Sequence, residues 1–276
     1  MINKKVLLGC LVSKHHEYCT REFLEGLKLI EKNVDIILIE NSDTKEFYNK
    51  LVKEADPKIK IIRYGNELKT TQEKLTSCRN YLREIFLKEK YDYFFSLDQD
   101  VVVPKYTIKK LISDQKDIVV GVYYNDKEIN GNIVAFPVLY KQYSRETQEQ
   151  MKNNKEIVRQ LNPELFKALQ KYNWDFQYVH RILTPKEVEG DNIIEIDHCG
   201  NACVLIKREV LEKIKFRYEG EFFDDMLFCK DVAKLGYNIY ADTSIKCKHL
   251  IENRPWKWNN KENITEIDYK RKFYID

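Results

Sequence analysis

Two aspartates separated by a single residue, Asp98 and Asp100, follow the apolar run Tyr91 to Leu97. The run predicts a buried strand, and because side chains alternate along a strand, both carboxylates project to the same side. If the sheet is parallel, the carboxyl end of this strand faces the ligand crevice. Two carboxylates there suit Mg²⁺ or Mn²⁺, which also takes water and substrate phosphate as ligands. The alternative is a polar strand end with two unpaired surface aspartates.

A second acidic pair, Asp224 and Asp225, follows two phenylalanines and opens a helical pattern that runs to Leu235. Acidic residues in a first turn favour the positive end of the helix dipole, so a structural role alone would explain them. The functional interpretation is that one of the two faces the crevice as a general base. His249 follows the last predicted strand and is either a ligand or an ordinary strand-end histidine.

Alternating strands and helices in the first half of the chain would position these carboxylates. Strands are predicted at 5–12, 35–40, 59–64 and 91–97, and helices at 21–31, from about 44, and at 70–88. The sequence Asn41-Ser42-Asp43 is expected to cap the helix that begins near Thr44. Strict alternation, at roughly thirty residues per unit, predicts a parallel sheet with helices on both faces.

The second half has a looser pattern. Helices are predicted at 106–113, 208–214 and 224–235, and strands at 117–124, 133–140, 193–206 and 238–245. Pro137 suggests that its strand lies at a sheet edge. The stretch 144–172 is polar and helical, with a break at Asn162-Pro163 that reads as an N-cap followed by proline at the first helical position. The poorest pattern lies at 125–190.

Composition excludes several classes of protein. The 276 residues include 47 Lys and Arg and 44 Asp and Glu, which gives a net charge of +3. A charge this small produces no electrostatic field over the whole molecule that would attract nucleic acid. The apolar run Val6 to Val12 is too short for a transmembrane segment or a signal peptide, so we expect a cytoplasmic protein. The seven cysteines form no CxxC pairs, which predicts reduced thiols and no structural zinc.

These motifs, in this order, resemble the GT-A glycosyltransferases, the nucleotide-sugar-dependent enzymes related to family 2. The landmarks are Glu40-Asn41-Ser42-Asp43, Arg79-Asn80, the Asp98 and Asp100 pair, the run Gly200 to Val210, Asp224-Asp225 and His249. The resemblance covers 1–124 and 193–250, whereas the middle third and the tail vary with the acceptor in this family. The sequence departs from the family's usual Glu-Asp pair, because its first acid is the shorter Asp224.

The resemblance implies an α/β fold: one GT-A (Rossmann-like) domain, with a mostly parallel central sheet flanked by helices and a variable acceptor-side insertion. It would comprise a nucleotide-sugar-binding half at 1–103, an acceptor and catalytic half at 104–250, and a C-terminal tail at 251–276. The implied reaction moves a sugar from a UDP-sugar or GDP-sugar to a hydroxyl acceptor with Mn²⁺ or Mg²⁺. The acceptor would be a glycan, a lipid-linked molecule or a small molecule.

The resemblance also implies residue roles. Asp100 would bind the metal, Asp98 would contact the ribose or the metal through water, and His249 would be a further metal or diphosphate ligand. Asn41 and Asp43 would lie near the nucleotide base, and Arg79 near the base or the diphosphate. Asp225 would be the catalytic base, with Asp224 as its neighbour or substitute. Gly200, Asn201 and Trp256 are the candidates on the acceptor side, where Trp256 either stacks on a sugar ring or packs on the core.

Three rival interpretations are weighed against this one. A metal-dependent phosphatase places its DxD near the N-terminus and follows it with threonine, and a nucleotidyltransferase has a glycine-rich loop after its first strand. This sequence has neither feature. A non-catalytic nucleotide- or carbohydrate-binding protein on the same fold stays open. Direct displacement with inversion rests on the Asp224-Asp225 pair, because retaining GT-A enzymes share the metal site.

Overall fold

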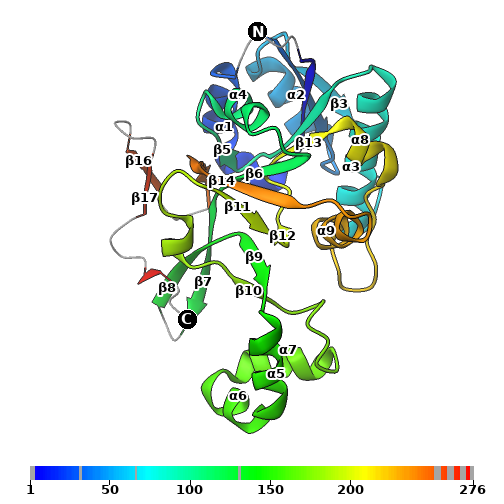
Figure 1. Cartoon of the computed structure of the whole chain (residues 1–276). Coiled ribbons are helices and arrows are strands. Elements are labelled where there is room, and N and C mark those ends of the chain that lie inside the picture. Colours follow the sequence, from blue (N-terminus) through cyan, green and yellow to red (C-terminus); the bar gives the residue numbers. More distant parts are fainter. Residues whose placement is uncertain are drawn as a thin grey trace.

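The computed structural model describes residues 4–30, 33–65, 67–129, 132–251, 256–259, 264–267 and 272–273 (Figure 1). At 127–129, 132–133 and from 256 onward it describes the backbone alone. Within these residues, no helix has the length and apolar character needed to cross a membrane.

A twisted eight-stranded sheet forms the centre of the molecule, with the strand order β11-β14-β6-β13-β4-β1-β2-β3 (Figure 1). Its strands are β1 (Val6–Val12), β2 (Val34–Glu40), β3 (Lys60–Arg63), β4 (Tyr93–Asp98), β6 (Ile118–Val122), β11 (Ile193–Ile196), β13 (Cys203–Lys207) and β14 (Ile239–Lys246). Neighbours from β3 to β4 are parallel, as are β6 and β14. Strand β13 runs antiparallel between β4 and β6, and β11 is antiparallel to β14. The predicted α/β fold with a mostly parallel sheet is therefore confirmed.

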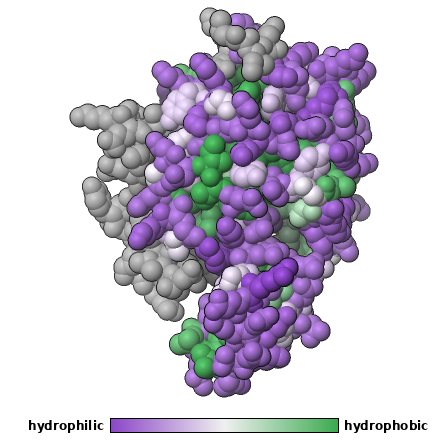
Figure 2. Space-filling model, in the orientation of Figure 1, coloured by the Kyte–Doolittle hydropathy of each residue, from purple (hydrophilic) through white to green (hydrophobic). Residues whose placement is uncertain are grey.

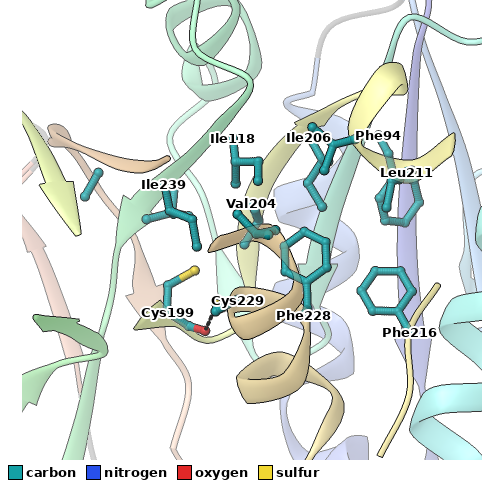
Figure 3. Close-up of a cluster of buried hydrophobic side chains, with 14 of the residues drawn as sticks. Phe94, Ile118, Cys199, Val204, Ile206, Leu211, Phe216, Phe228, Cys229 and Ile239 are labelled. Carbon is teal, nitrogen blue, oxygen red and sulfur yellow. Dashed lines mark hydrogen bonds between the residues drawn. The ribbon is translucent and has the colours of Figure 1, made fainter. Parts of the chain in front are cut away.

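Helices cover both faces of this sheet, because successive apolar residues in its strands point to opposite sides. On one face, Leu7 and Phe94 belong to a core formed with the helices α3 (Thr71–Lys88), α8 (Arg208–Lys213) and α9 (Asp224–Lys234) (Figure 3). On the other face, Leu8 and Phe95 belong to a core formed with α1 (Thr20–Lys28), α2 (Lys45–Glu54) and α4 (Thr107–Ser113). Each pair of adjacent strand residues therefore contributes to both cores.

Helix α2 differs from the expectation at its start. Its N-cap is Thr44, whose side chain accepts no capping hydrogen bond. The hydroxyl of Ser42 instead accepts a hydrogen bond from the backbone N–H of Lys14, over 2.8 Å. The predicted cap at 41–43 is wrong because this segment bonds to the loop after β1.

The strand predicted at 193–206 is also wrong, since the structure divides it into three. Strands β11 and β13 lie in the central sheet, whereas β12 (His198–Cys199) pairs with β9 (Leu139–Gln142), which also pairs with β10 (His180–Ile182). The division occurs at Asp197, whose carboxylate accepts a hydrogen bond from the backbone of Gln142, and again at 200–202. The partner of β12 lies about sixty residues away in β9, so the local sequence could not locate these breaks.

The insertion forms a helical lobe below the sheet in Figure 1, made of α5 (Arg145–Asn153), α6 (Lys155–Leu161) and α7 (Pro163–Lys171). The helix break predicted at Asn162-Pro163 is confirmed, because the Asn162 side chain caps α7 by accepting a hydrogen bond from the N–H of Leu165. The face seen in Figure 2 is mostly hydrophilic. Leu161, an apolar residue at the end of α6, is nevertheless 81% exposed.

Short elements complete the fold. They are the 3₁₀ helices η1 (Lys14–Cys19) and η2 (Pro185–Val188), and the strands β5 (Val101–Val102), β7 (Tyr124–Ile129), β8 (Asn132–Pro137), β15 (Lys248–His249), β16 (Trp256–Asn259), β17 (Ile264–Ile267) and β18 (Lys272–Phe273). Strand β8 lies between β7 and β18, so the predicted edge position is wrong. Pro137 is tolerated because it is the last residue of β8, beyond the residues that pair with β18.

Candidate active site

A cavity of about 460 Å³ lies at the carboxyl ends of β1, β2 and β4. Crevices at this end of a parallel sheet are the usual ligand sites of α/β folds. Most of the site residues chosen from the sequence line it: Asn41, Arg79, Asp98, Asp100, Gly200, Asn201, Asp224, Asp225 and His249. Residues from the first 100 positions and from the last third of the chain thus meet in one place.

Of the two remaining chosen residues, Asp43 is not among the described residues that line the cavity. The side chain of Asp43 is 80% exposed, and its carboxylate accepts a hydrogen bond from the Lys74 ammonium over 2.6 Å. Trp256 belongs to strand β16, and its side chain lies outside the described residues.

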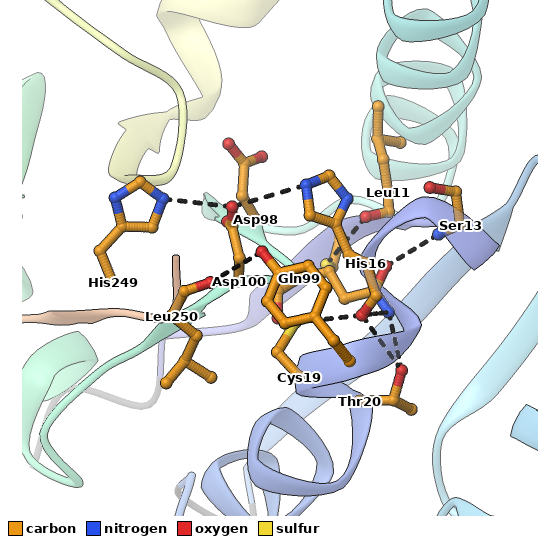
Figure 4. A network of polar contacts seen from close by, with 12 residues as sticks. Leu11, Ser13, His16, Cys19, Thr20, Asp98, Gln99, Asp100, His249 and Leu250 are labelled. Carbon is orange, nitrogen blue, oxygen red and sulfur yellow. Dashed lines mark hydrogen bonds and ion pairs between the residues drawn. The ribbon is translucent and has the colours of Figure 1, made fainter. Parts of the chain in front are cut away.

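Asp100 and His249 contact each other, with 3.1 Å between Oδ2 and Nε2 (Figure 4). The contact depends on two short strands, because β5 and β15 pair antiparallel with His249 opposite Val101. The backbone N–H of Leu250 also donates to the carbonyl of Asp100, over 2.6 Å. The loop after β4 and the end of the last core strand are thereby joined.

The other ring nitrogen of His249, Nδ1, lies 2.8 Å from the carbonyl oxygen of Tyr124. Because a carbonyl only accepts, this contact places a proton on Nδ1 and directs Nε2 toward Asp100. Burial alone would lower the pKa of His249, but the hydrogen bond and the charge of Asp100 outweigh it, and the pKa is raised. Burial would likewise raise the pKa of Asp100, whereas the hydrogen bond to His249 lowers it.

Two residues that the sequence reasoning missed, His16 and Gln99, complete this cluster (Figure 4). The Nε2 atom of His16 lies 3.6 Å from Oδ2 of Asp100. Gln99 is buried, and its amide accepts from the N–H of Ser13 and donates to the carbonyl of His16 and the hydroxyl of Thr20. These bonds fix the Asp98–Asp100 loop against η1. In the sequence, the polar pair His15-His16 just after the first strand could have pointed to His16 as a site residue.

Arg79 is a buried cation held between two carboxylates. Its Nε donates to Asp224 over 2.7 Å, and its Nη2 donates to Asp98 over 3.3 Å. The side chains of Arg79 and Asp224 are only 8% and 3% exposed. Burial alone would lower the pKa of Arg79, but the charges of Asp224 and Asp98 raise it, so the guanidinium stays charged. Asp224 is therefore the counter-ion of Arg79.

Asp225 differs from its neighbour, because no ion pair to it is present in the described part of the chain. Its Oδ1 accepts a hydrogen bond from the N–H of Met226, and burial raises its pKa. Burial also raises the pKa of Asp98 to about 6, although the charge of Arg79 acts in the opposite direction. The cavity thus holds carboxyl groups that retain protons to higher pH than exposed aspartates do.

Gly200 and Asn201 form another wall of the cavity. A Cβ atom at Gly200 would lie only 2.1 Å from the hydroxyl oxygen of Tyr123, so a side chain there would displace this tyrosine. Both polar atoms of the Asn201 amide are buried and lack a hydrogen-bond partner among the described residues. A buried amide of this kind normally has a partner. Asn201 is thus suited to bind a ligand in the cavity.

The donor set fits a divalent cation at Asp100 and His249. A carboxylate and an imidazole, whose second nitrogen is held by a backbone carbonyl, are an arrangement typical of metal sites. No group of three or more His, Cys, Asp and Glu side chains among the described residues could hold a metal ion. Two protein ligands leave the other positions to water and phosphate oxygens, as is usual for Mg²⁺.

Comparison with known families gives a match over most of the chain. The model of the Anp1 family matches residues 3–214. The chain belongs to the Anp1 family. A comparison with curated proteins found no match.

Solved structures similar to this Anp1 chain include glycosyltransferases. "Crystal structure of GalNAc-T7 with UDP, GalNAc and Mn2+" is 12% identical, with a TM-score of 0.56 over 90% of this chain and 44% of that one. A mannosyltransferase from Pyrobaculum calidifontis, in complex with GDP-Man and Mn2+, is 12% identical, with a TM-score of 0.49 over 91% of this chain and 58% of that one. The chain thus spans about half the length of these two proteins. The structural likeness to GalNAc-T7 shows the GT-A fold.

Proposed function

We propose that this Anp1 protein is a metal-dependent glycosyltransferase that moves a sugar from a nucleoside-diphosphate sugar to a hydroxyl acceptor, with inversion. The observation that carries this proposal is the position of Asp225, which lines the same cavity as Asp100 and His249. Its neighbour Asp224 is instead paired with Arg79. A carboxylate free to take a proton and a candidate cation site are the two parts that this reaction needs.

We assign the donor to the side of the cavity formed by residues 1–103 and the acceptor to the side formed by 104–250. All four of Asn41, Arg79, Gly200 and Asn201 line the cavity, and in this proposal the first two serve the donor and the last two the acceptor. The crystal structure of GalNAc-T7 is one with UDP, GalNAc and Mn2+, which supports a UDP-sugar or the related GDP-sugar as donor.

In the proposed reaction, the acceptor hydroxyl attacks the anomeric carbon and its proton passes to Asp225. The bond between that carbon and the diphosphate oxygen breaks, and its electron pair leaves with the diphosphate. Mn²⁺ or Mg²⁺ bound by Asp100 and His249 would supply Lewis-acid stabilisation of that leaving group. A base on the face opposite the leaving group gives inversion, as in inverting glycosidases. Asp224 stays paired with Arg79 and is not assigned a part in the proton transfer.

Two matched variants test this proposal. UDP-, GDP-, dTDP- and CMP-sugars are screened with Mn²⁺ for thermal stabilisation and for slow donor hydrolysis. We expect Asp100→Ala to abolish the effect of the metal on nucleotide binding. Asp225→Asn should preserve nucleotide binding and lower the transfer rate by about 10² to 10⁴.

Each failure has a separate meaning. If no nucleotide sugar stabilises the protein, with or without metal, the proposed glycosyltransferase activity is refuted. A carbohydrate-binding protein on this fold would then be the remaining hypothesis. Full transfer by Asp225→Asn would refute the assignment of the base. A product with retained anomeric configuration, seen by NMR, would refute direct displacement.

A further inference from the structure

A second cavity, of about 490 Å³, lies between helix α9 and the small sheet β10-β9-β12. Its lining includes Gln142 of β9, His180 of β10 and His198 of β12. From the helix side, Met226 and Lys230 also line it. None of these residues has a part in the reaction proposed above.

The two cavities adjoin along two elements. On β9, Tyr140 lines the active-site cavity and Gln142 lines the second cavity. Residues two apart in a strand lie on the same face and about 7 Å apart, so these side chains form one continuous surface. At the start of α9, Asp225 lines the first cavity and its neighbour Met226 the second. A ligand that extends from Asp225 along β9 would enter the second cavity.

His198 gives a direct sign of a missing hydrogen-bond partner. Its Nε2 is buried and has no partner among the described residues. Its ring makes an edge contact with Tyr140 over 5.2 Å between centroids, which ties it to the active-site side. Burial lowers its pKa to about 4, so the imidazole is neutral at pH 7 and can donate or accept one hydrogen bond.

Aromatic rings and charged groups of both signs make up much of the remaining lining, the charged residues being Lys230, Lys234, Glu195 and Asp197. Tyr178 and Phe222 are stacked, with 5.7 Å between their ring centroids. Lys230 donates to the hydroxyl of Tyr178 over 2.7 Å, and Lys234 is the second lysine of the lining. The two exposed carboxylates of Glu195 and Asp197 offset these two lysines, so the lining has no net charge that would favour an anionic or a cationic ligand.

We propose that the second cavity binds a neutral oligosaccharide, namely the sugar units adjacent to the one that carries the attacking hydroxyl. Aromatic rings suit the apolar faces of sugars, and His180, His198 and Gln142 suit their hydroxyl groups. The acceptor is accordingly a glycan chain rather than a single sugar. This inference rests on the proposed function for its catalytic meaning, but the binding site can be tested without the donor.

The test is saturation-transfer NMR without donor or metal, using mannotriose, maltotriose, cellotriose and chitotriose beside the three corresponding monosaccharides, mannose, glucose and N-acetylglucosamine. We expect at least one trisaccharide to bind about tenfold or more tightly than its monosaccharide, as one ring contact and one hydrogen bond would give. Tyr178→Ala and His180→Gln should each weaken that binding about tenfold. The matched control is Tyr218→Ala, at an exposed tyrosine that lines neither cavity.

Melting curves and far-UV circular dichroism establish that each variant is folded, and His180→Gln preserves side-chain polarity if Tyr178→Ala disturbs the aromatic stack. The inference is overturned if no trisaccharide binds more tightly than its monosaccharide, or if folded lining variants bind as the wild type does. The protein could also bind a trisaccharide through His180 and yet respond to no nucleotide sugar. That result would refute the proposed transferase function and support the glycan-binding site.

Discussion

Arg79 gives different roles to two adjacent aspartates. Its guanidinium is buried between Asp98 and Asp224, and these three groups form a charged cluster in which the side chain of Asp224 is buried and that of Asp98 is 35% exposed. Asp225, the next residue, lines the cavity and is not part of this cluster. At the scale of single residues, one helix start thus supplies a structural counter-ion and the proposed base.

Replacing Arg79 should therefore destabilise the fold strongly. We expect Arg79→Met to lower the free energy of unfolding by about 3 to 5 kcal/mol, because it leaves the buried carboxylate of Asp224 without a cation. The additional change Asp224→Asn should restore part of this loss. Urea denaturation measures both, with Lys167→Met as control, since the pair Lys167–Glu164 is exposed and worth about 1 kcal/mol or less. Equal losses in Arg79→Met and the control would contradict the buried cluster.

The proposed base also predicts a pH dependence. Burial raises the pKa of Asp225, so it keeps its proton to higher pH than an exposed aspartate. Because a base acts only when deprotonated, kcat/KM should fall on the acid side at a pH above the ordinary aspartate value of about 3.9. A pH profile of transfer measures this. The same acid limb in the residual activity of Asp225→Asn would assign it to another group, such as Asp98.

At the scale of secondary-structure elements, caps and short pairings set where the site residues stand. Helix α3, which carries Arg79, starts with a capping box: the Thr70 hydroxyl accepts from the N–H of Glu73, and the Glu73 carboxylate accepts from the N–H of Thr70. Strand β15 places His249 opposite β5, next to Asp100. Helix or strand propensity alone would not place Arg79 or His249 at the cavity.

The cap of α3 predicts a measurable difference between two threonines. Thr70→Ala should lower the free energy of unfolding by about 1 kcal/mol, because it removes the capping hydrogen bond. Thr44→Ala, at the N-cap of α2, where no such bond exists, should cost clearly less. Parallel thermal or urea unfolding compares the two proteins. An equal loss in both would show that the capping box contributes little.

For the molecule as a whole, the acid side of the stability curve should depend on His198. Its pKa lies near 4 in the folded protein because of burial, against about 6.5 when it is unfolded. The unfolded chain then binds more protons between these values, so stability falls as the pH is lowered from about 6.5 to 4, by up to about 3 kcal/mol. His180, whose pKa burial also lowers, acts in the same direction.

His198→Gln isolates this contribution. We expect the variant to lose less stability than the wild type between pH 6.5 and 4, as measured by urea denaturation at a series of pH values. His180→Gln serves as the comparison at the neighbouring ring. Parallel curves for the wild type and His198→Gln would contradict the low pKa of His198.

Local sequence signals predicted much of the framework. The strands of the first half, the long helix α3 and the break at Asn162-Pro163 follow from apolar period, capping residues and proline, which act over a few neighbours. Asp98 at the end of β4 could be placed at the ligand edge for the same reason. The cap at 41–43 and the continuous strand at 193–206 failed because competing partners lie far along the chain.

The tertiary structure decided which side chains meet. Arg79 and Asp224 are 145 positions apart, and Asp100 and His249 are 149 apart, so no local pattern could show that they touch. The sequence by itself determined the sheet, its helices and the acidic strand end, since these depend on short-range propensity and burial. Strand order and register decided which carboxylate is paired and where the two cavities adjoin, because only these fix distances between remote residues.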